Sequence, residues 1–138
     1  MNSVTIEQLN GFIQQAFPGF KARVEKLDQH FAKLRHPIAQ SDLRPGGTVS
    51  GPTLFAVADA ALYMAILNEI GLKPLAVTTN LNINFLNKPD AQCDLIADCR
   101  LIKVGKRLIM GDVFIYSEGV EDPVAHATGT YSIPPAHI

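Results

Sequence analysis

The stretch that decides the fold is GPTLFAVADAALYMAIL, residues 51–67. As a helix it is apolar on nearly every side, so it needs cover all round. One charged residue, Asp59, stands in its middle. Because an unpaired carboxylate is costly to bury, such a group changes its pKa or finds partners. Asp59 is therefore a candidate reactive residue, and the alternative is a core aspartate that is hydrogen-bonded to the backbone.

The overall composition predicts one globular domain over residues 1–138. Hydrophobic residues make up 47% of the chain and charged residues 18%. The net charge of −1 provides no field that would attract nucleic acid or an anionic membrane. The apolar stretch is shorter than the roughly 20 residues of a membrane span, so a buried core helix is favoured. We therefore expect neither nucleic acid nor a membrane as a partner.

Two further features of the sequence indicate the cellular compartment of the protein. The first residues, MNSVTIEQLNGF, lack the basic segment and long apolar run of a signal peptide. Cys93 and Cys99 fall in one predicted strand, about 20 Å apart at about 3.3 Å per residue. That separation is too large for a disulfide between them. These features favour a cytoplasmic protein.

Hydrophobic periodicity predicts a second, shorter helix and six strands. Residues 5–16 have the pattern of an amphipathic helix with Thr5 as its N-cap. Alternation of apolar and polar residues predicts strands over 20–28, 30–38, 76–87, 93–104, 107–117 and 123–133. A long loop over residues 36–50 leads into the apolar helix. An α+β hot-dog fold, in which a curled antiparallel sheet wraps the long helix, satisfies this order.

The start of the apolar helix is a second candidate for chemistry. Pro52 suits the first helical turn, which places Gly51 near the N-cap and Ser50 beside it. Free backbone N–H groups and the positive end of the helix dipole gather at such a position. They suit an anion or a developing oxyanion. Gly51 is thus a candidate catalytic donor, and the alternative is a simple helix cap.

The run RPGGTVSGPTLFAVAD, residues 44–59, resembles the helix start of hot-dog acyl-CoA thioesterases of the phenylacetate-pathway and 4-hydroxybenzoyl-CoA type. Those enzymes carry Asn-x-x-Gly-x-x-His-Gly-Gly, and an Asp or Glu follows eight residues after the first Gly of the His-Gly-Gly. Three residues fall in register with this motif: Gly47, Gly51 and Asp59. Three others replace the Asn, the His and the second Gly of the pair: Arg44, Ser50 and Pro52.

The resemblance implies hydrolysis of an acyl-CoA thioester to a free acid and CoA. Asp59 would be the general base or nucleophile, and the Gly51 N–H would be the oxyanion donor. The substrate-binding candidates are Arg44, Gly47, Ser50, Tyr63, Thr79, Asn80, Lys103, Lys106 and Arg107. Most of them have a plainer alternative: a solvent-facing arginine or asparagine, a helix cap, a packed phenol or a basic hairpin turn. No closely spaced His, Cys or carboxylate set is visible, so we expect no metal and no cofactor.

The spacing of the two catalytic candidates predicts a dimer. Gly51 and Asp59 are eight residues apart, which is about 12 Å along a helix and about 80° around it. They cannot reach one carbonyl group from the same helix. A two-fold dimer with antiparallel helices would place Gly51 of one chain near Asp59 of the other. We therefore expect a homodimer or homotetramer.

Two alternatives stay open. A non-catalytic protein that binds acyl-CoA or another small ligand could keep this fold without the family His and Asn. A hot-dog dehydratase would need a His paired with a carboxylate across the interface, and Ser50 argues against that.

Overall fold

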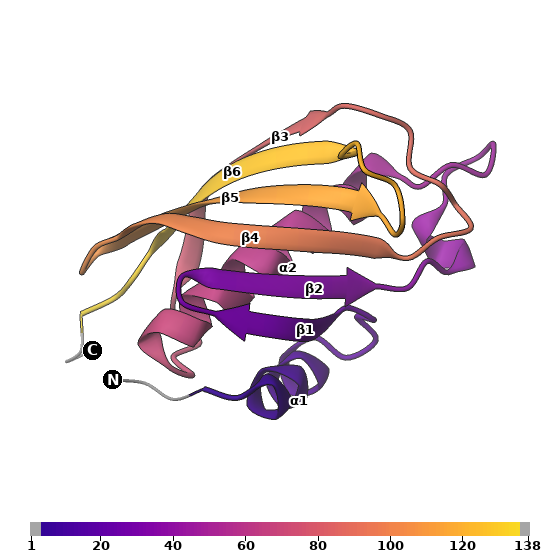
Figure 1. The fold of residues 1–138 in the computed structure, drawn as a ribbon. Helices are drawn as coiled ribbons and strands as arrows, with labels where there is room; N and C mark the ends of the chain where they lie inside the picture. The colour runs from indigo at the N-terminus through magenta and orange to yellow at the C-terminus, as the bar shows by residue number, and fades with distance from the viewer. Residues whose placement is uncertain (1–3, 136–138) are drawn as a thin grey trace.

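The structure is a computed structural model that describes residues 4–135. Its elements, in chain order, are α1 (Ile6–Ala16), β1 (Arg23–Asp28), β2 (Phe31–His36), the 3₁₀ turn η1 (Gln40–Asp42), α2 (Gly51–Ile70), β3 (Val77–Phe85), β4 (Leu95–Val104), β5 (Leu108–Ser117) and β6 (Ala125–Ser132). The strands form one antiparallel sheet in the order β1-β2-β4-β5-β6-β3. The sheet curls over α2, and α1 lies beside β1 (Figure 1).

This arrangement confirms the predicted hot-dog fold. The elements match the predicted segments, and most strands are a few residues shorter than the alternation suggested. Two details differ. Cys93 lies in the bend before β4 rather than inside the strand, and the predicted loop 36–50 contains the turn η1. The single-domain prediction also includes residues 1–3 and 136–138, which lie outside the described residues.

Helix α1 covers β1, which is an edge strand of the sheet. It begins with a capping box, in which Thr5 and Gln8 each accept the other's backbone N–H at 3.1 and 3.0 Å. The Asn10 side chain then makes two hydrogen bonds with the backbone of Val24. Its Oδ1 accepts the Val24 N–H at 2.7 Å, and its Nδ2 donates to the Val24 carbonyl at 3.2 Å. The helix thus satisfies part of the free edge of β1 and buries Leu9 and Ile13.

Helix α2 is the core of the molecule. It has the length and hydropathy of a membrane span, but 56% of that window is buried inside the fold, as in a core helix. Leu62 packs where α2 approaches the sheet, above two glycines that face each other on β5 and β6, Gly111 and Gly129. A Cβ at Gly129 would lie 2.5 Å from Leu62 Cδ2, so a side chain there is excluded.

Strand β3 lies at the other edge and pairs only with β6 among the described strands. Its register shifts between Thr78 and Asn80, which is a β-bulge. Beyond the bulge, Leu81, Ile83 and Phe85 oppose buried residues of β6 and face α2. The three asparagines Asn80, Asn82 and Asn84 share the opposite, outer face, as their alternation predicted.

Candidate functional site

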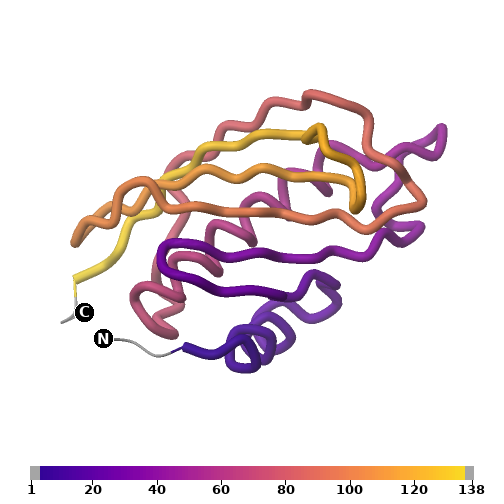
Figure 2. Tube along the Cα trace, viewed as in Figure 1, coloured from indigo at the N-terminus to yellow at the C-terminus, as the bar shows by residue number. Residues whose placement is uncertain are grey.

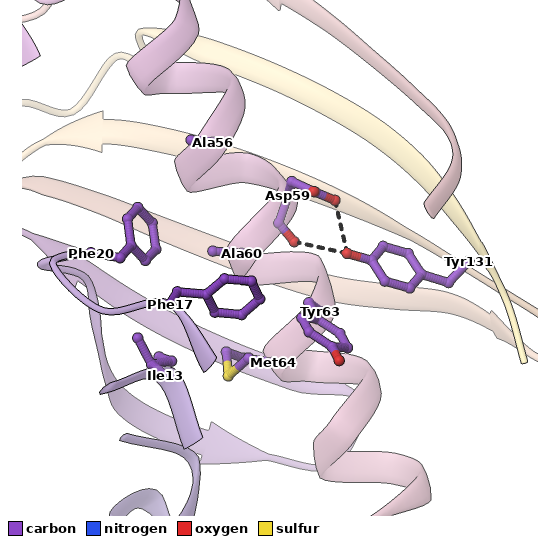
Figure 3. A pocket seen from close by; sticks show the side chains of 9 residues that line it. All are labelled: Ile13, Phe17, Phe20, Ala56, Asp59, Ala60, Tyr63, Met64 and Tyr131. Atoms are coloured by element: carbon purple, nitrogen blue, oxygen red, sulfur yellow. Dashed lines mark hydrogen bonds between the residues drawn. The ribbon is translucent and has the colours of Figure 1, made fainter. Parts of the chain in front are cut away.

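Asp59 lies half-buried in the middle of α2 and is held by two hydroxyl groups from the sheet. Tyr131 Oη donates to Asp59 Oδ1 at 2.8 Å, and Thr78 Oγ1 donates to the same oxygen at 3.0 Å. Figure 3 shows the Tyr131 hydroxyl directed at Asp59. Within residues 4–135 no donor reaches Oδ2, so one oxygen fixes the carboxylate and the other is left for chemistry.

Tyr131 is a stable donor in this arrangement. It is 3% exposed, and its ring stacks on Tyr63 with the centroids 5.5 Å apart. Burial raises the pKa of the Tyr131 phenol far above its ordinary value, and the neighbouring Asp59 carboxylate raises it further. The phenol therefore keeps its proton and donates to Asp59 across the working pH range.

Asp59 borders an apolar cavity of about 250 Å³. The lining residues come from α1, the segment after it, α2 and β6: Ile13, Phe17, Phe20, Ala56, Asp59, Ala60, Tyr63, Met64 and Tyr131. Figure 3 shows them around α2. Burial raises the pKa of Tyr63, whose hydroxyl donates to the Pro74 carbonyl at 3.0 Å. A carboxylate at the edge of an apolar cavity suits a substrate with an apolar group beside a reactive carbonyl.

The start of α2 holds a single free backbone donor. Ser50 is the N-cap: its N–H donates to the Asp42 carbonyl, and its Oγ accepts the Thr53 N–H. Pro52 has no N–H, and the Leu54 N–H donates to the Ser50 carbonyl. Among the described residues, the Gly51 N–H is thus the donor of this turn without a partner. The start of α2 can hold a negative oxygen at this N–H.

Gly51 also has a packing reason to be glycine. A Cβ at this position would lie 3.3 Å from the Phe85 ring, which extends from β3 over the helix start. The two roles are compatible, because a bare backbone lets both Phe85 and a ligand come close.

A buried polar cluster anchors the loop before α2. Asp42 Oδ2 accepts the Ala39 N–H at 2.8 Å and pairs with Lys21 Nζ at 3.0 Å. Asp42 Oδ1 lies 3.1 Å from His36 Nε2. Burial alone would raise the pKa of Asp42, but the bonds from Ala39, Lys21 and His36 outweigh it and lower that pKa. Figure 2 shows the loop leaving β2 and returning to the start of α2.

The remaining candidates near the start of α2 make hydrogen bonds within the loop before it. Arg44 and Gly47 close a tight turn through the Gly47 N–H and the Arg44 carbonyl at 3.0 Å. Gly46 and Gly47 have φ values of 100° and 81°, which favour glycine. The Ser50 hydroxyl is engaged with Thr53 Oγ1 at 2.9 Å. The structure thus gathers Arg44, Gly47, Ser50 and Gly51 at one end of α2, away from Asp59 at its middle.

The other candidates lie elsewhere. Thr79, the bulge residue of β3, donates to the Thr130 carbonyl at 3.2 Å. Asn80 sits on the outer face of the sheet. Lys106 and Arg107 line an open groove together with Lys73, near the last turn of α2. Lys103 is exposed on β4 beside the same hairpin. Among the predicted residues, Asp59 and Tyr63 are those that share the cavity.

Sequence reasoning missed Tyr131 and Thr78, the two residues that hold Asp59. The strand pattern around Tyr131 places it on the inner face, and this signal could have marked it as a partner for a buried charge. Thr78 could not be found this way, because the bulge reverses the face on which it lies.

The described residues, 4–135, contain no group of three or more His, Cys, Asp or Glu positioned to hold a metal ion. Asp59 has hydroxyl neighbours rather than further carboxylates or imidazoles. With these neighbours Asp59 can act as a carboxylate on a carbonyl carbon or on water.

Comparison with known proteins agrees with this geometry. A family model described as the thioesterase superfamily matches residues 46–124. The match covers more than half of the chain: the end of the loop before α2, all of α2, and strands β3, β4 and β5. The chain therefore belongs to the thioesterase superfamily, and this likeness supports a hydrolase.

Three relatives illustrate the likeness. The crystal structure of a provisionally named thioesterase from Silicibacter sp. is 39% identical, with a TM-score of 0.90 over 98% of this chain and 95% of that one. The PaaI protein from the phenylacetic acid degradation operon of E. coli is 25% identical, with a TM-score of 0.75 over 90% and 89%. A provisionally named esterase from Saccharolobus solfataricus is 29% identical over 94% of this chain and 86% of its own length.

Proposed function

We propose that this protein hydrolyses acyl-CoA thioesters, with Asp59 as the reacting carboxylate at a dimer interface. The observation that carries the proposal is the position of Asp59: it borders an apolar cavity, and the described residues hold it through one oxygen only. Membership in the thioesterase superfamily supports thioester hydrolysis as the reaction class. The likeness to a PaaI protein from a phenylacetic acid degradation operon supports a small carboxylic acid as the acyl part of the substrate.

The chemistry needs a base and an oxyanion donor. As a general base, Asp59 takes a proton from a water molecule whose oxygen attacks the thioester carbonyl carbon. The carbonyl oxygen becomes negative and accepts the Gly51 N–H. When the C–S bond breaks, the sulfur leaves with the proton that Asp59 had taken. As a nucleophile, Asp59 would instead attack the carbonyl carbon and expel CoA as its thiolate, which forms a mixed anhydride. Water then cleaves the anhydride to the free acid and the Asp59 carboxylate.

A second copy of the chain completes the site. Gly51 and Asp59 are separated by about 12 Å along α2, which is too far for one carbonyl group. Strand β3 supports an antiparallel dimer, because it is an edge strand with exposed apolar side chains, notably Val77 and Phe85. A partner joined there through a two-fold axis would bring its Gly51 toward Asp59.

The basic groove suits the other end of the substrate. Lys73, Lys106 and Arg107 surround an open surface groove that also contains apolar residues such as Leu72 and Leu75. Phosphates pair with such cations, and an adenine ring can lie on the apolar part. We assign this groove to the nucleotide part of CoA, with Lys103 at its margin.

A thiol-release assay tests the reaction. Wild-type protein and Asp122→Asn, an exposed turn control, should release free CoA from a panel of acyl-CoAs without added metal. Absence of thiol release from every acyl-CoA, together with tight acyl-CoA binding, would favour the non-catalytic binding protein instead. Label found in Asp59 after a single turnover in H₂¹⁸O would identify Asp59 as the nucleophile, because the general-base route puts the label in the acid product.

A complementation experiment tests the shared site. Gly51→Pro removes the N–H donor, whereas Gly51→Ala adds a side chain and keeps the donor. Gly51→Ala therefore measures the effect of packing alone, and Gly51→Pro should lower turnover further than Gly51→Ala does. Inactive Gly51→Pro and inactive Asp59→Asn are then unfolded together and refolded. Statistical mixing should restore about one quarter of wild-type activity, since half of the dimers carry one intact site. Failure to restore activity would contradict a site shared between chains.

A further inference from the structure

The cavity beside Asp59 has walls of hydrocarbon from two helices. Ile13 and Phe17 come from α1 and its C-cap, and Ala60 and Met64 come from α2. Phe17 is held in an aromatic cluster, edge-on to Phe12 and to Tyr63 with centroids 6.3 Å apart in each case. The short helix α1, which the sheet does not need for its own pairing, therefore supplies one side of the cavity.

The polar groups of the cavity have no hydrogen to offer a ligand. Tyr63 donates its hydroxyl hydrogen to the Pro74 carbonyl, and Tyr131 donates to Asp59. The third polar residue is Asp59 itself. An acyl group with a hydroxyl or carboxyl at its far end would therefore lose water without gaining a donor from these side chains.

We propose that this cavity binds an unsubstituted hydrocarbon acyl group and that α1 sets its length. The inference rests on the proposed function, since Asp59 fixes where the thioester carbonyl lies. A cavity of about 150 Å³ holds benzene, so a cavity of about 250 Å³ has room for about ten carbons. The acyl class is thus medium-length and apolar, rather than hydroxylated.

A chain-length series tests the class. We expect kcat/KM to rise about fourfold per methylene from butyryl-CoA onward and to stop rising by about ten carbons. 8-Hydroxyoctanoyl-CoA should react about 100-fold less efficiently than octanoyl-CoA. Equal rates along the series, or equal rates with and without the hydroxyl, would overturn the proposal.

Two variants test the two walls. Ala60→Phe fills the cavity from α2, and we expect it to lower the octanoyl-to-acetyl ratio of kcat/KM about 100-fold. Phe17→Ala removes the α1 wall. It should lower that ratio about tenfold and let kcat/KM keep rising beyond ten carbons, because α1 then no longer limits the length. Phe114→Ala is the matched control, because Phe114 is similarly exposed but lies on the outer face of the sheet. An unchanged ratio in both cavity variants would contradict the assignment.

Binding separates this inference from the reaction. Octyl-CoA and methyl-CoA thioethers resist hydrolysis, and titration calorimetry measures their affinities for the wild type and Ala60→Phe. We expect octyl-CoA to bind at least tenfold more tightly than methyl-CoA, with this advantage lost in Ala60→Phe. If no thioester is hydrolysed but this pattern holds, the reaction is wrong and the acyl site stands. If the two thioethers bind alike, the acyl site is wrong whatever the reaction.

Discussion

Two aspartates of this protein, the buried Asp42 and the half-buried Asp59, are bonded in different ways. Both oxygens of Asp42 have partners, among them the Ala39 N–H and Lys21 on one and His36 on the other. Asp59 receives both of its donors, Tyr131 and Thr78, on a single oxygen. A carboxylate engaged on both oxygens holds a loop in place. One with a free oxygen beside a cavity can accept a proton or attack a carbonyl.

The same substitution at the two positions should separate these roles most strongly. Asp59→Asn keeps the shape and the hydrogen-bonding capacity of the side chain but cannot act as a base. We expect thioester hydrolysis to fall by about 100-fold or more, while acyl-CoA binding stays similar. Folding should be nearly intact, and stability can even rise because a half-buried charge is removed. Turnover at the wild-type rate would make Asp59 a packing residue like Asp42.

Asp42→Asn should do the reverse. An asparagine has one oxygen and one NH₂ group where Asp42 has two oxygens. In either orientation its NH₂ group would face a donor, which is His36 on one side and the Ala39 N–H with Lys21 on the other. We expect a loss of about 2 kcal/mol in the free energy of unfolding. Urea denaturation followed by circular dichroism measures this loss, and activity per folded molecule should change far less than in Asp59→Asn. A variant as stable as the wild type would show that the cluster does not hold the loop.

Tyr131→Phe tests whether Tyr131 acts through Asp59. The variant removes one hydrogen bond to a charged oxygen, worth about 1.5 kcal/mol, so kcat should fall about tenfold with little change in KM. A purely structural role would lower activity only as the folded fraction falls. In an Asp59→Asn background, Tyr131→Phe should have no further effect on turnover, because residues acting as a unit are not additive. Additive losses would contradict the positioning role.

The fold could be predicted because its signals are local. The apolar pattern of α2 demands cover on all sides, and alternation marks each strand. The Thr5 capping box is set by residues three apart. Asp59 was found for the same reason, as a charge where the pattern allows none.

The partners of Asp59 were not predicted, because their contacts with it depend on distant pairing. Tyr131 lies 72 residues from Asp59. Alternation along β3 would place Thr78 on the outer face with Asn80, but the bulge between them turns Thr78 inward. The role of Asp42 was also hidden, since its partners Lys21 and His36 come from the segment around β1 and from β2. A single sequence shows the residues of such clusters but not their contacts.

His36 gives the smallest expected effect, with a sign that can be checked. Burial lowers the pKa of His36, and the pull of Asp42 only partly offsets this. Its buried Nδ1 has no hydrogen-bond partner among residues 4–135, which fits a neutral ring donating from Nε2 to Asp42. The unfolded chain then binds a proton near the ordinary pKa of about 6.5, and the folded chain does so only at lower pH. Stability should therefore fall as the pH drops below about 6.5, by at most about 1.4 kcal/mol per pH unit.

His36→Gln keeps a donor for Asp42 without titrating, so the difference between its urea midpoints and those of the wild type isolates this group. If the wild type instead gains stability relative to His36→Gln between pH 7 and 5.5, the pair is His⁺ with Asp⁻, and the neutral assignment is wrong.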